Sequence, residues 1–189
     1  MTNCDVQGYV AAALAALEHP SRYREAHAYI LAHAAEALPV LLAALDGTDE
    51  RLACAAAQVL GTLDDADSMA AALSPLGHQA LYGRASVATA AVCALSALPV
   101  TRAAVLTLEE ALRSEHATVR LEAALGLARL GAQGTRPLER RAASALAGLD
   151  PADVPAAVGA SLSRLEPGAR SVLIPVALSL NYEGALAAL

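Results

Sequence analysis

The chain has no Phe, no Trp and no Lys, and aromatic residues make up only 3% of it. Sheets depend on β-branched and aromatic residues, whereas Ala and Leu stand near the top of the helix-propensity scale. Ala is the commonest residue here and Leu the next, in a chain that is 56% hydrophobic. This composition predicts an all-α protein. Because large rings are scarce, its core must gain apolar burial from many small contacts between closely approaching helices.

Positive charge is also in short supply. The 13 basic residues, all of them Arg, are outnumbered by 19 acidic residues, which gives a formal net charge of -6. A nucleic-acid-binding protein carries a basic face that displaces counterions. The Arg residues here are dispersed, apart from Arg136, Arg140 and Arg141, which we expect to form a solvated helix face. The charge balance therefore argues against a nucleic-acid partner.

Cysteine is sparse: Cys4, Cys54 and Cys93 are widely separated, and no CxxC or Cys/His metal-ligand spacing occurs. This excludes a disulfide framework and a structural zinc site of the usual kind. Asp5 stands where a signal peptide needs a basic residue, and no run reaches the roughly 18 apolar residues of a membrane span. We therefore expect a soluble, cytoplasmic protein of one domain, residues 1–189, with no metal, cofactor or membrane partner.

What the sequence does contain is an internal repeat. Each copy starts with an aliphatic residue, has small or aliphatic residues four and five positions later, and has Leu at its ninth and twelfth positions. On a helix these positions fall on one broad face, which predicts the buried face. The copies start 35, 32 and 35 residues apart, and they are Leu52–Leu63, Val87–Leu98, Val119–Leu130 and Val154–Leu165.

A second set of apolar helical segments lies between these copies. Pro opens several of them, at a helix position where its missing N–H does no harm. Thr48-Asp49, Ser86 and Asp150 are predicted N-caps of the repeat helices. The unit is thus a helical hairpin repeated about five times, so that neighbouring hairpins bury a continuous core. The intervening segments are Pro39–Leu45, Val100–Leu112, Arg136–Leu149 and Ser171–Leu180.

The two ends depart from this pattern. Helices are expected over Asp5–Glu18 and Arg22–Ala35, in a degenerate capping repeat that spans residues 1–36. The core repeats span residues 37–166, and residues 167–189 form a partial or capping repeat. The apolar C-terminal helix leaves three alternatives: it folds back as a lid, it packs on another chain to give a homo-oligomer, or the repeat is truncated.

The segment LRSEHATVRLEAALGLARLG, Leu112–Gly131, resembles the HEAT-like repeat of bacterial phycocyanobilin lyases and related solenoids. Leu45–Leu63 is a second, looser copy. The family pattern places Val-Arg at the start of the second helix, and only Val119-Arg120 has it here. The resemblance implies a right-handed α-solenoid of about five HEAT-like hairpins. It also implies that binding residues gather on the concave wall.

Candidate binding positions lie three, six and ten residues after each repeat start, on the helix stripe opposite the predicted buried face. The middle of this wall is small and weakly polar, and its charged residues gather toward the C-terminal half. Such a groove suits an extended peptide or a helix, with Arg side chains pairing with carboxylates. The alternative is that small residues merely permit tight curvature. The predicted partner-binding residues are Gln58, Cys93, Glu122, Leu125, Arg129 and Arg164.

A second cluster combines Tyr and His near the N-terminus. Tyr23 and His27 are four residues apart and share one helix face, and Tyr29 and His33 share another. His can serve as a base or a metal ligand. No carboxylate accompanies a His pair with the spacing of a zinc protease, so a structural capping role is favoured over ligand binding and over catalysis.

The acidic turn of Asp64, Asp65 and Asp67 is a third candidate. A calcium loop needs a longer run with ligands at alternate positions. The turn is therefore predicted to be solvated and to cap the helical segment Ser68–Leu73.

These features predict an interaction scaffold or adaptor that binds a protein or peptide partner on a curved wall. The rival class is an enzyme or enzyme subunit that uses the groove as a small-molecule pocket. Resemblance to the lyases implies a chromophore-handling role, but no matched catalytic residue supports it. A glycosylase of the same architecture needs basic and aromatic residues along the groove, and these are missing here. A specialised-metabolism enzyme with Tyr or His as acid–base groups stays open.

Overall fold

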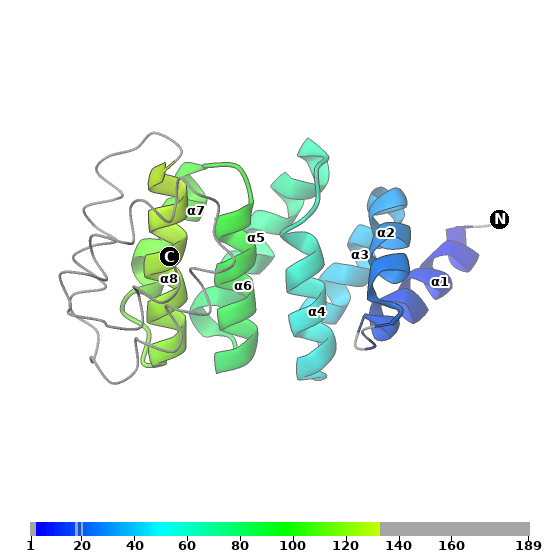
Figure 1. Ribbon diagram of the computed structural model, residues 1–189, viewed down its shortest axis with the longest axis horizontal. Helices are drawn as coiled ribbons and strands as arrows, with labels where there is room; N and C mark the ends of the chain where they lie inside the picture. The colour runs from blue at the N-terminus through cyan, green and yellow to red at the C-terminus, as the bar shows by residue number, and fades with distance from the viewer. Residues whose placement is uncertain (1–2, 18, 20, 133–189) are drawn as a thin grey trace. The chain divides into compact units, whose positions relative to one another are not determined.

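The computed structural model describes residues 3–17, 19 and 21–132. Every regular element among them is an α-helix, and no strand occurs in this part of the chain, which confirms the all-α prediction as far as the description extends (Figure 1). The helices are α1 (Asn3–Ala16), α2 (Tyr23–Ala32), α3 (Ala34–Leu45), α4 (Glu50–Leu60), α5 (Ala66–Tyr82), α6 (Ala85–Ala97), α7 (Arg102–Ala111) and α8 (Ala117–Ala132).

The chain forms two compact units. The first, Met1–Pro99, contains α1 to α6, and the second, Val100–Leu189, contains α7 and α8. The expectation of one repeat domain stays a prediction. Four further predictions lie outside the described residues: the helical segments Arg136–Leu149, Val154–Leu165 and Ser171–Leu180, and the cap at Asp150.

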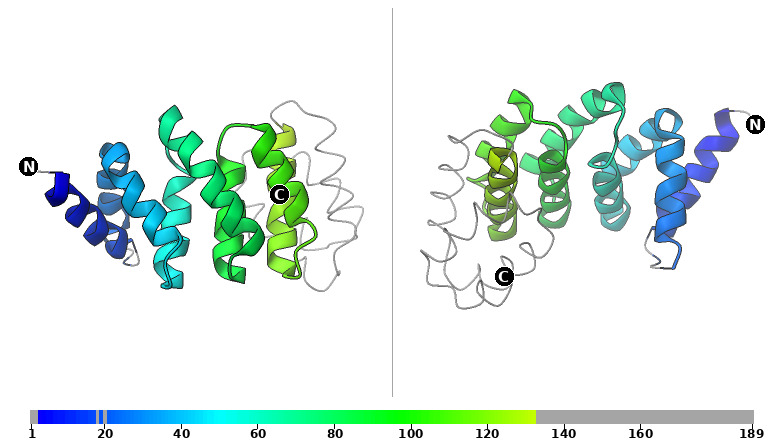
Figure 2. Two further views of the ribbon diagram at one scale, coloured as in Figure 1. Left: turned by 180° about the vertical axis from the view of Figure 1, so that it is seen from behind. Right: turned by 45° about the horizontal axis from the view of Figure 1, so that its top comes forward.

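In the first unit, helices pack as two stacked hairpins. α3 packs against α4 and α5 against α6, while α4 also contacts α6 and α3 contacts α5. Figures 1 and 2 show α4 and α6 on one side of this unit, with α3 and α5 behind them. α1 contacts α2, α3 and α4. The predicted pairing of a repeat helix with the preceding apolar helix is therefore present for the first copy, and α5 takes the corresponding place before the second.

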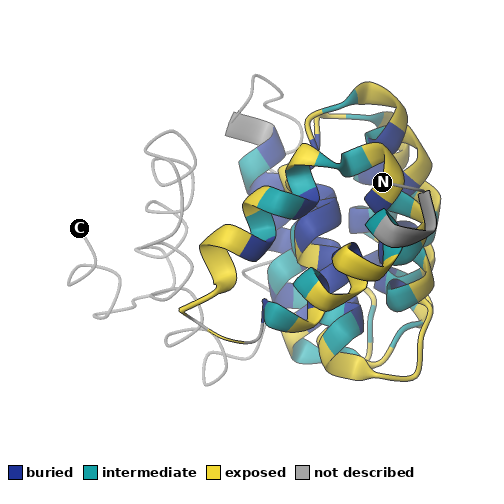
Figure 3. Ribbon diagram, turned by 90° about the vertical axis from the view of Figure 1, so that its right-hand side faces the viewer, coloured by how far each residue is buried: buried dark blue, intermediate teal, exposed yellow. Residues whose placement is uncertain are grey.

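The core of the first unit consists of small and branched aliphatic side chains, as the composition predicts. Ala56, Ala57 and Leu60 of α4 are each 0% exposed. Gly61, at the end of α4, lies so close to α6 that an added Cβ would stand 2.7 Å from the Cα of Ala94. Figure 3 shows buried stretches on the inward faces of the helices and exposed stretches on their outward faces. Small residues therefore set the close approach of the helices.

Side-chain caps begin two helices of the first unit. Asp49 accepts hydrogen bonds from the backbone N–H groups of Arg51 and Leu52 and begins α4, as predicted. Asp65 accepts from the N–H of Ser68 and begins α5, which confirms the capping function of the acidic turn. The predicted cap at Ser86 is wrong, because Arg84 is the N-cap and Ser86 already lies inside α6.

Two predictions near the N-terminus are also wrong in detail. The expected helix Arg22–Ala35 is divided, because the chain turns at His33 and α2 and α3 meet at 115°. α3 then starts at Ala34, so Pro39 lies inside a helix instead of opening one. Pro39 is exposed, so its ring lies on the solvent side of α3.

No single helix in the described part is long and apolar enough to cross a membrane. The bent pair of α2 and α3 meets that length and composition only when the two helices are counted together.

In the second unit, α7 packs against α8. Thr101 caps α7 by accepting a hydrogen bond from the N–H of Ala104. The guanidinium of Arg120, from the Val-Arg pair, donates through Nη1 to the carbonyls of Ser114 (2.8 Å) and Glu115 (2.9 Å). Those carbonyls belong to the turn just before α8, so Arg120 fixes the entry into its own helix.

A candidate binding hollow on helix α4

A hollow of about 540 Å³, open to solvent, lies over one face of α4 in the first unit. Its floor comes from residues spaced three, four and seven positions after Arg51, which is the spacing of a single helix face. Leu17, just after the end of α1, and Ser86, near the start of α6, form its sides. Glu50, at the start of α4, completes the lining. The full set is Leu17, Glu50, Arg51, Cys54, Ala55, Gln58 and Ser86.

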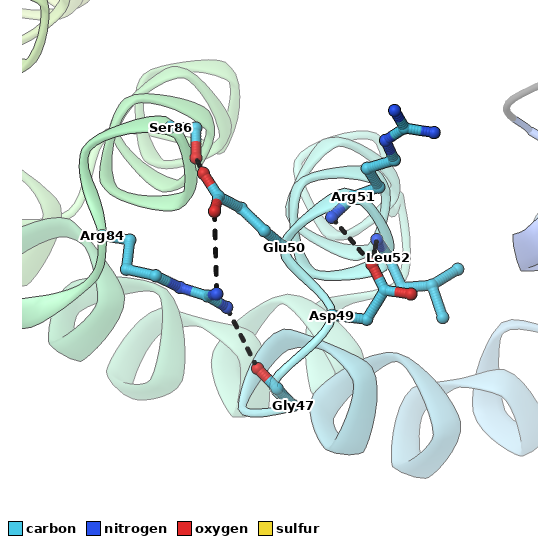
Figure 4. Close-up of polar contacts among 7 residues, drawn as sticks. All are labelled: Gly47, Asp49, Glu50, Arg51, Leu52, Arg84 and Ser86. Atoms are coloured by element: carbon cyan, nitrogen blue, oxygen red, sulfur yellow. Dashed lines mark hydrogen bonds and ion pairs between the residues drawn. The ribbon is translucent and has the colours of Figure 1, made fainter.

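One side of the hollow is a polar network that joins three segments (Figure 4). The guanidinium of Arg84 lies 3.6 Å from the Glu50 carboxylate through Nη1, and it donates to the carbonyl of Gly47 at 3.5 Å through Nη2. The hydroxyl of Ser86 donates to the other carboxylate oxygen of Glu50. The side chains of Arg84 and Glu50 are about half exposed, so the ion pair itself adds little to stability. Its role is to hold Glu50 toward α6.

Arg51 projects the other way. Figure 4 shows its side chain on the opposite side of α4 from the Glu50 carboxylate. Its backbone N–H is 3.0 Å from Oδ1 of Asp49, so the cap fixes the first turn from which the side chain extends. Arg51 is exposed, and within the described part of the chain no ion pair engages its guanidinium. The hollow thus has one paired charge and one charge available to a ligand.

Cys54 contributes a thiol to the floor of the hollow. Burial raises the pKa of this thiol above its ordinary value of 9.0, and the Glu50 carboxylate acts in the same direction. The hydrogen bond with Ser86 and the Arg84 charge oppose that rise in the pKa without cancelling it. The thiol is therefore protonated at neutral pH, and a protonated thiol is a poor nucleophile and metal ligand.

The predicted partner-binding residues have different positions. Gln58 is exposed and lines the hollow. Cys93 is half-buried on α6. Glu122 and Arg129 are half-buried on α8, in the second unit. Their predicted contacts with a partner stay predictions.

Leu125 and Arg164 are the remaining residues of the predicted set. Leu125 is 0% exposed, so its expected place on an accessible wall is wrong. Its neighbours Ala124 and Leu127 are equally buried. Helix α8 is therefore covered on more sides than we predicted from the positions three, six and ten residues after each repeat start. Arg164 lies outside the described residues.

The Tyr/His cluster forms the two predicted pairs. The rings of Tyr23 and His27 stack with centroids 5.7 Å apart, and those of Tyr29 and His33 lie 4.4 Å apart. Nε2 of His27 is 3.0 Å from the hydroxyl oxygen of Thr62, whose own proton goes to a backbone carbonyl, so His27 donates. Nδ1 of His33 is 2.9 Å from the carbonyl of Tyr29. These bonds link α2 to the end of α4 and close the turn into α3.

Five residues that line the hollow were not predicted as site residues from the sequence: Leu17, Glu50, Arg51, Cys54 and Ser86. Arg51 lies on the same face of α4 as Cys54, three residues later. That spacing was available from the sequence, because Asp49 was correctly predicted as the N-cap of this helix. Leu17 and Glu50 had no such signal, because their place in the hollow depends on how α1 and α6 pack against α4.

Comparison with known proteins adds no assignment. A scan against models of known protein families gives no match to this chain, and a search of curated proteins finds none that is similar. Among the described residues, no group of three or more His, Cys, Asp or Glu side chains is placed to hold a metal ion.

Proposed function

We propose that this protein is an interaction module that binds a peptide segment of a partner protein in the α4 hollow. We further propose that its hairpins belong to a right-handed α-solenoid of about five HEAT-like repeats. The stacking of α3/α4 on α5/α6 supports the second proposal, together with the resemblance of Leu112–Gly131 to the HEAT-like repeat.

The observation that carries the binding proposal is the hollow itself. It lies on the stripe of α4 that includes the predicted residues Ala55 and Gln58, and its volume is in the usual range of about 300–1,000 Å³ for ligand sites. It is open to solvent and combines small apolar side chains with exposed polar ones. An open hollow of this kind suits a chain segment that continues beyond both ends.

The chemistry of the lining favours recognition over catalysis. The Cys54 thiol has a raised pKa, and the Glu50 carboxylate is engaged by Arg84 and Ser86. A nucleophile needs an adjacent base or a lowered pKa, and a general base needs a free acceptor near the substrate. Arg51 and Gln58 supply instead the ionic and hydrogen-bonding groups that orient a peptide.

The test begins with a random peptide library displayed against the immobilised full chain. We expect enriched peptides, and an Ala55→Arg variant should weaken binding of the most enriched peptide by about tenfold or more, because a long side chain then fills the hollow. Isothermal titration calorimetry with the synthetic peptide measures this.

Ala43→Arg is the matched control, since Ala43 is exposed on α3 and does not line the hollow. Both variants must keep the far-UV circular dichroism and melting temperature of the wild type. If no peptide is enriched, or if the two variants bind the enriched peptide equally well, the proposal is wrong.

A further inference from the structure

The chemistry of the hollow specifies the kind of peptide, on the assumption that the proposed function holds. We propose that it binds an internal, extended segment that carries an Asp or Glu side chain about three residues away from a backbone group paired with Gln58, with a small aliphatic side chain between them. Arg51 pairs with the carboxylate, and Leu17, Cys54 and Ala55 contact the aliphatic side chain.

Charge complementarity selects the acidic end. Of the charged groups around the hollow, Glu50 is paired with Arg84, and the Asp49 carboxylate is used as the cap of α4. Both carboxylates are thus engaged by donors of the protein itself, Glu50 by Arg84 and Asp49 through its Oδ1. The Arg51 guanidinium is exposed, and its planar donor array matches a carboxylate in a two-bond geometry.

Helix geometry sets the length of the segment. Arg51 and Gln58 are seven residues apart on α4, which places them on one face about 10 Å apart along the helix axis. An extended peptide advances about 3.3 Å per residue, so about three residues span that distance. The Gln58 amide provides both a donor and an acceptor, as needed to pair with a peptide group.

The floor between these two side chains selects a small apolar side chain. Cys54 and Ala55 have small side chains and are half-buried, and Leu17 beside them is 8% exposed. A charged or bulky side chain there would lose hydration or collide with α4. The thiol of Cys54 contributes as a small apolar group because it is protonated.

The openness of the hollow favours an internal segment over a chain terminus. A site that captures a terminal carboxylate needs a closed end with several convergent donors. Here the hollow is open to solvent, Arg51 is exposed, and the charged donor is a single side chain. The carboxylate is therefore expected to come from an Asp or Glu side chain.

The experiment uses the full chain and the peptides enriched in the selection described above. We expect the enriched sequences to share an acidic residue one or two positions from a small aliphatic residue such as Ala or Val, and replacing the acidic residue by its amide should weaken binding about tenfold. Arg51→Glu should weaken binding of the acidic peptide to a similar degree or more. It should also prefer the same peptide with Lys in place of the acidic residue.

Arg102→Glu is the matched control, because Arg102 is exposed on α7 and does not line the hollow, and it should bind both peptides as the wild type does. A C-terminally amidated peptide with unchanged affinity supports the side-chain carboxylate, and loss of binding on amidation overturns the internal segment. If enriched peptides lose affinity with Ala55→Arg but are insensitive to Arg51→Glu, the acidic-segment proposal is wrong while the binding module stands. If no peptide is enriched, both fail.

Discussion

Single residues decide how near the helices of the first unit approach one another. Gly61 lies against Ala94 of α6, and a Cβ at position 61 would stand 2.7 Å from the Ala94 Cα and 2.9 Å from its Cβ. Both distances are shorter than real Cβ contacts, and the obstructing atoms are backbone or directly attached to it. The α4–α6 contact that brings Ser86 beside Glu50 therefore depends on a residue without a side chain.

Gly61→Ala should lower the free energy of unfolding by about 1–3 kcal/mol, because α6 must move to accommodate the new methyl group. Urea unfolding followed by far-UV circular dichroism measures it. Gly8→Ala is the control: it lies within α1 with nothing within 4 Å of the added Cβ, so it should stabilise by about 0.5–1 kcal/mol. Equal effects of the two substitutions would contradict the close packing at Gly61.

At the scale of the element, side-chain caps mark the starts of three helices, α4, α5 and α7. Asp49, Asp65 and Thr101 each satisfy backbone N–H groups that the first turn leaves unpaired. α6 has no such side-chain cap, since its N-cap is Arg84. The Arg84 side chain is used instead to connect the starts of α4 and α6 through Glu50 and Gly47. At the start of α6, the N-cap residue Arg84 therefore contacts the polar side of the hollow and does not cap its own helix.

The cap at Asp65 predicts a pH dependence. Hydrogen bonds from the backbone N–H and the side chain of Ser68 hold the pKa of the Asp65 carboxyl below its ordinary value of 3.8. Because the pKa of Asp65 is lower in the folded protein than in the unfolded chain, the ionised carboxylate stabilises the fold. This stabilisation is complete at pH values above the unfolded-state pKa of 3.8, and it is lost as the pH falls below 3.8 and through the pKa of the folded state. The wild type should therefore exceed Asp65→Asn in stability at pH 7, by a margin that shrinks toward pH 2.

Urea midpoints of the two proteins across that range measure the margin. Asp64→Asn serves as the control, since Asp64 is exposed and does not cap α5. A margin for Asp65→Asn that stays constant with pH would show that the charge of the cap contributes nothing beyond its hydrogen bonds.

At the scale of the whole chain, each compact unit has its own buried side chains. Leu41 in α3 and Leu108 in α7 are both 0% exposed, and they lie in different units. In stacked helical hairpins a side chain contacts mainly its own and adjacent hairpins, so destabilisation stays local. The interaction site proposed above belongs entirely to the first unit.

Leu41→Ala should reduce hydrogen-exchange protection in α3 to α6 more than in α7 and α8, and Leu108→Ala should do the reverse. Each removes a fully buried side chain, at a cost of about 2–5 kcal/mol. Native-state hydrogen exchange with mass spectrometry resolves the two groups of helices. Equal loss of protection throughout, from either variant, would mean that the described chain unfolds as one cooperative unit.

The amino-acid sequence by itself determined the helical class, the positions of α4, α6 and α8 and two of the three caps assigned within the described chain. These depend on propensity, on the 3.6-residue period and on hydrogen bonds between near neighbours, all of which are local. The break at His33 was not predictable in this way, because the apolar pattern runs through it and only packing of α2 and α3 against α1 decides where the chain turns.

Only the tertiary structure decided the composition of the hollow. Gln58 was predicted from its place on α4, but Leu17 and Ser86 come from segments more than 25 residues distant in the sequence. Leu125 was misassigned for the same reason: its exposure depends on what covers α8, and no local period reports that. A binding site is defined by which faces remain uncovered after the helices pack, and that is a property of long-range contacts.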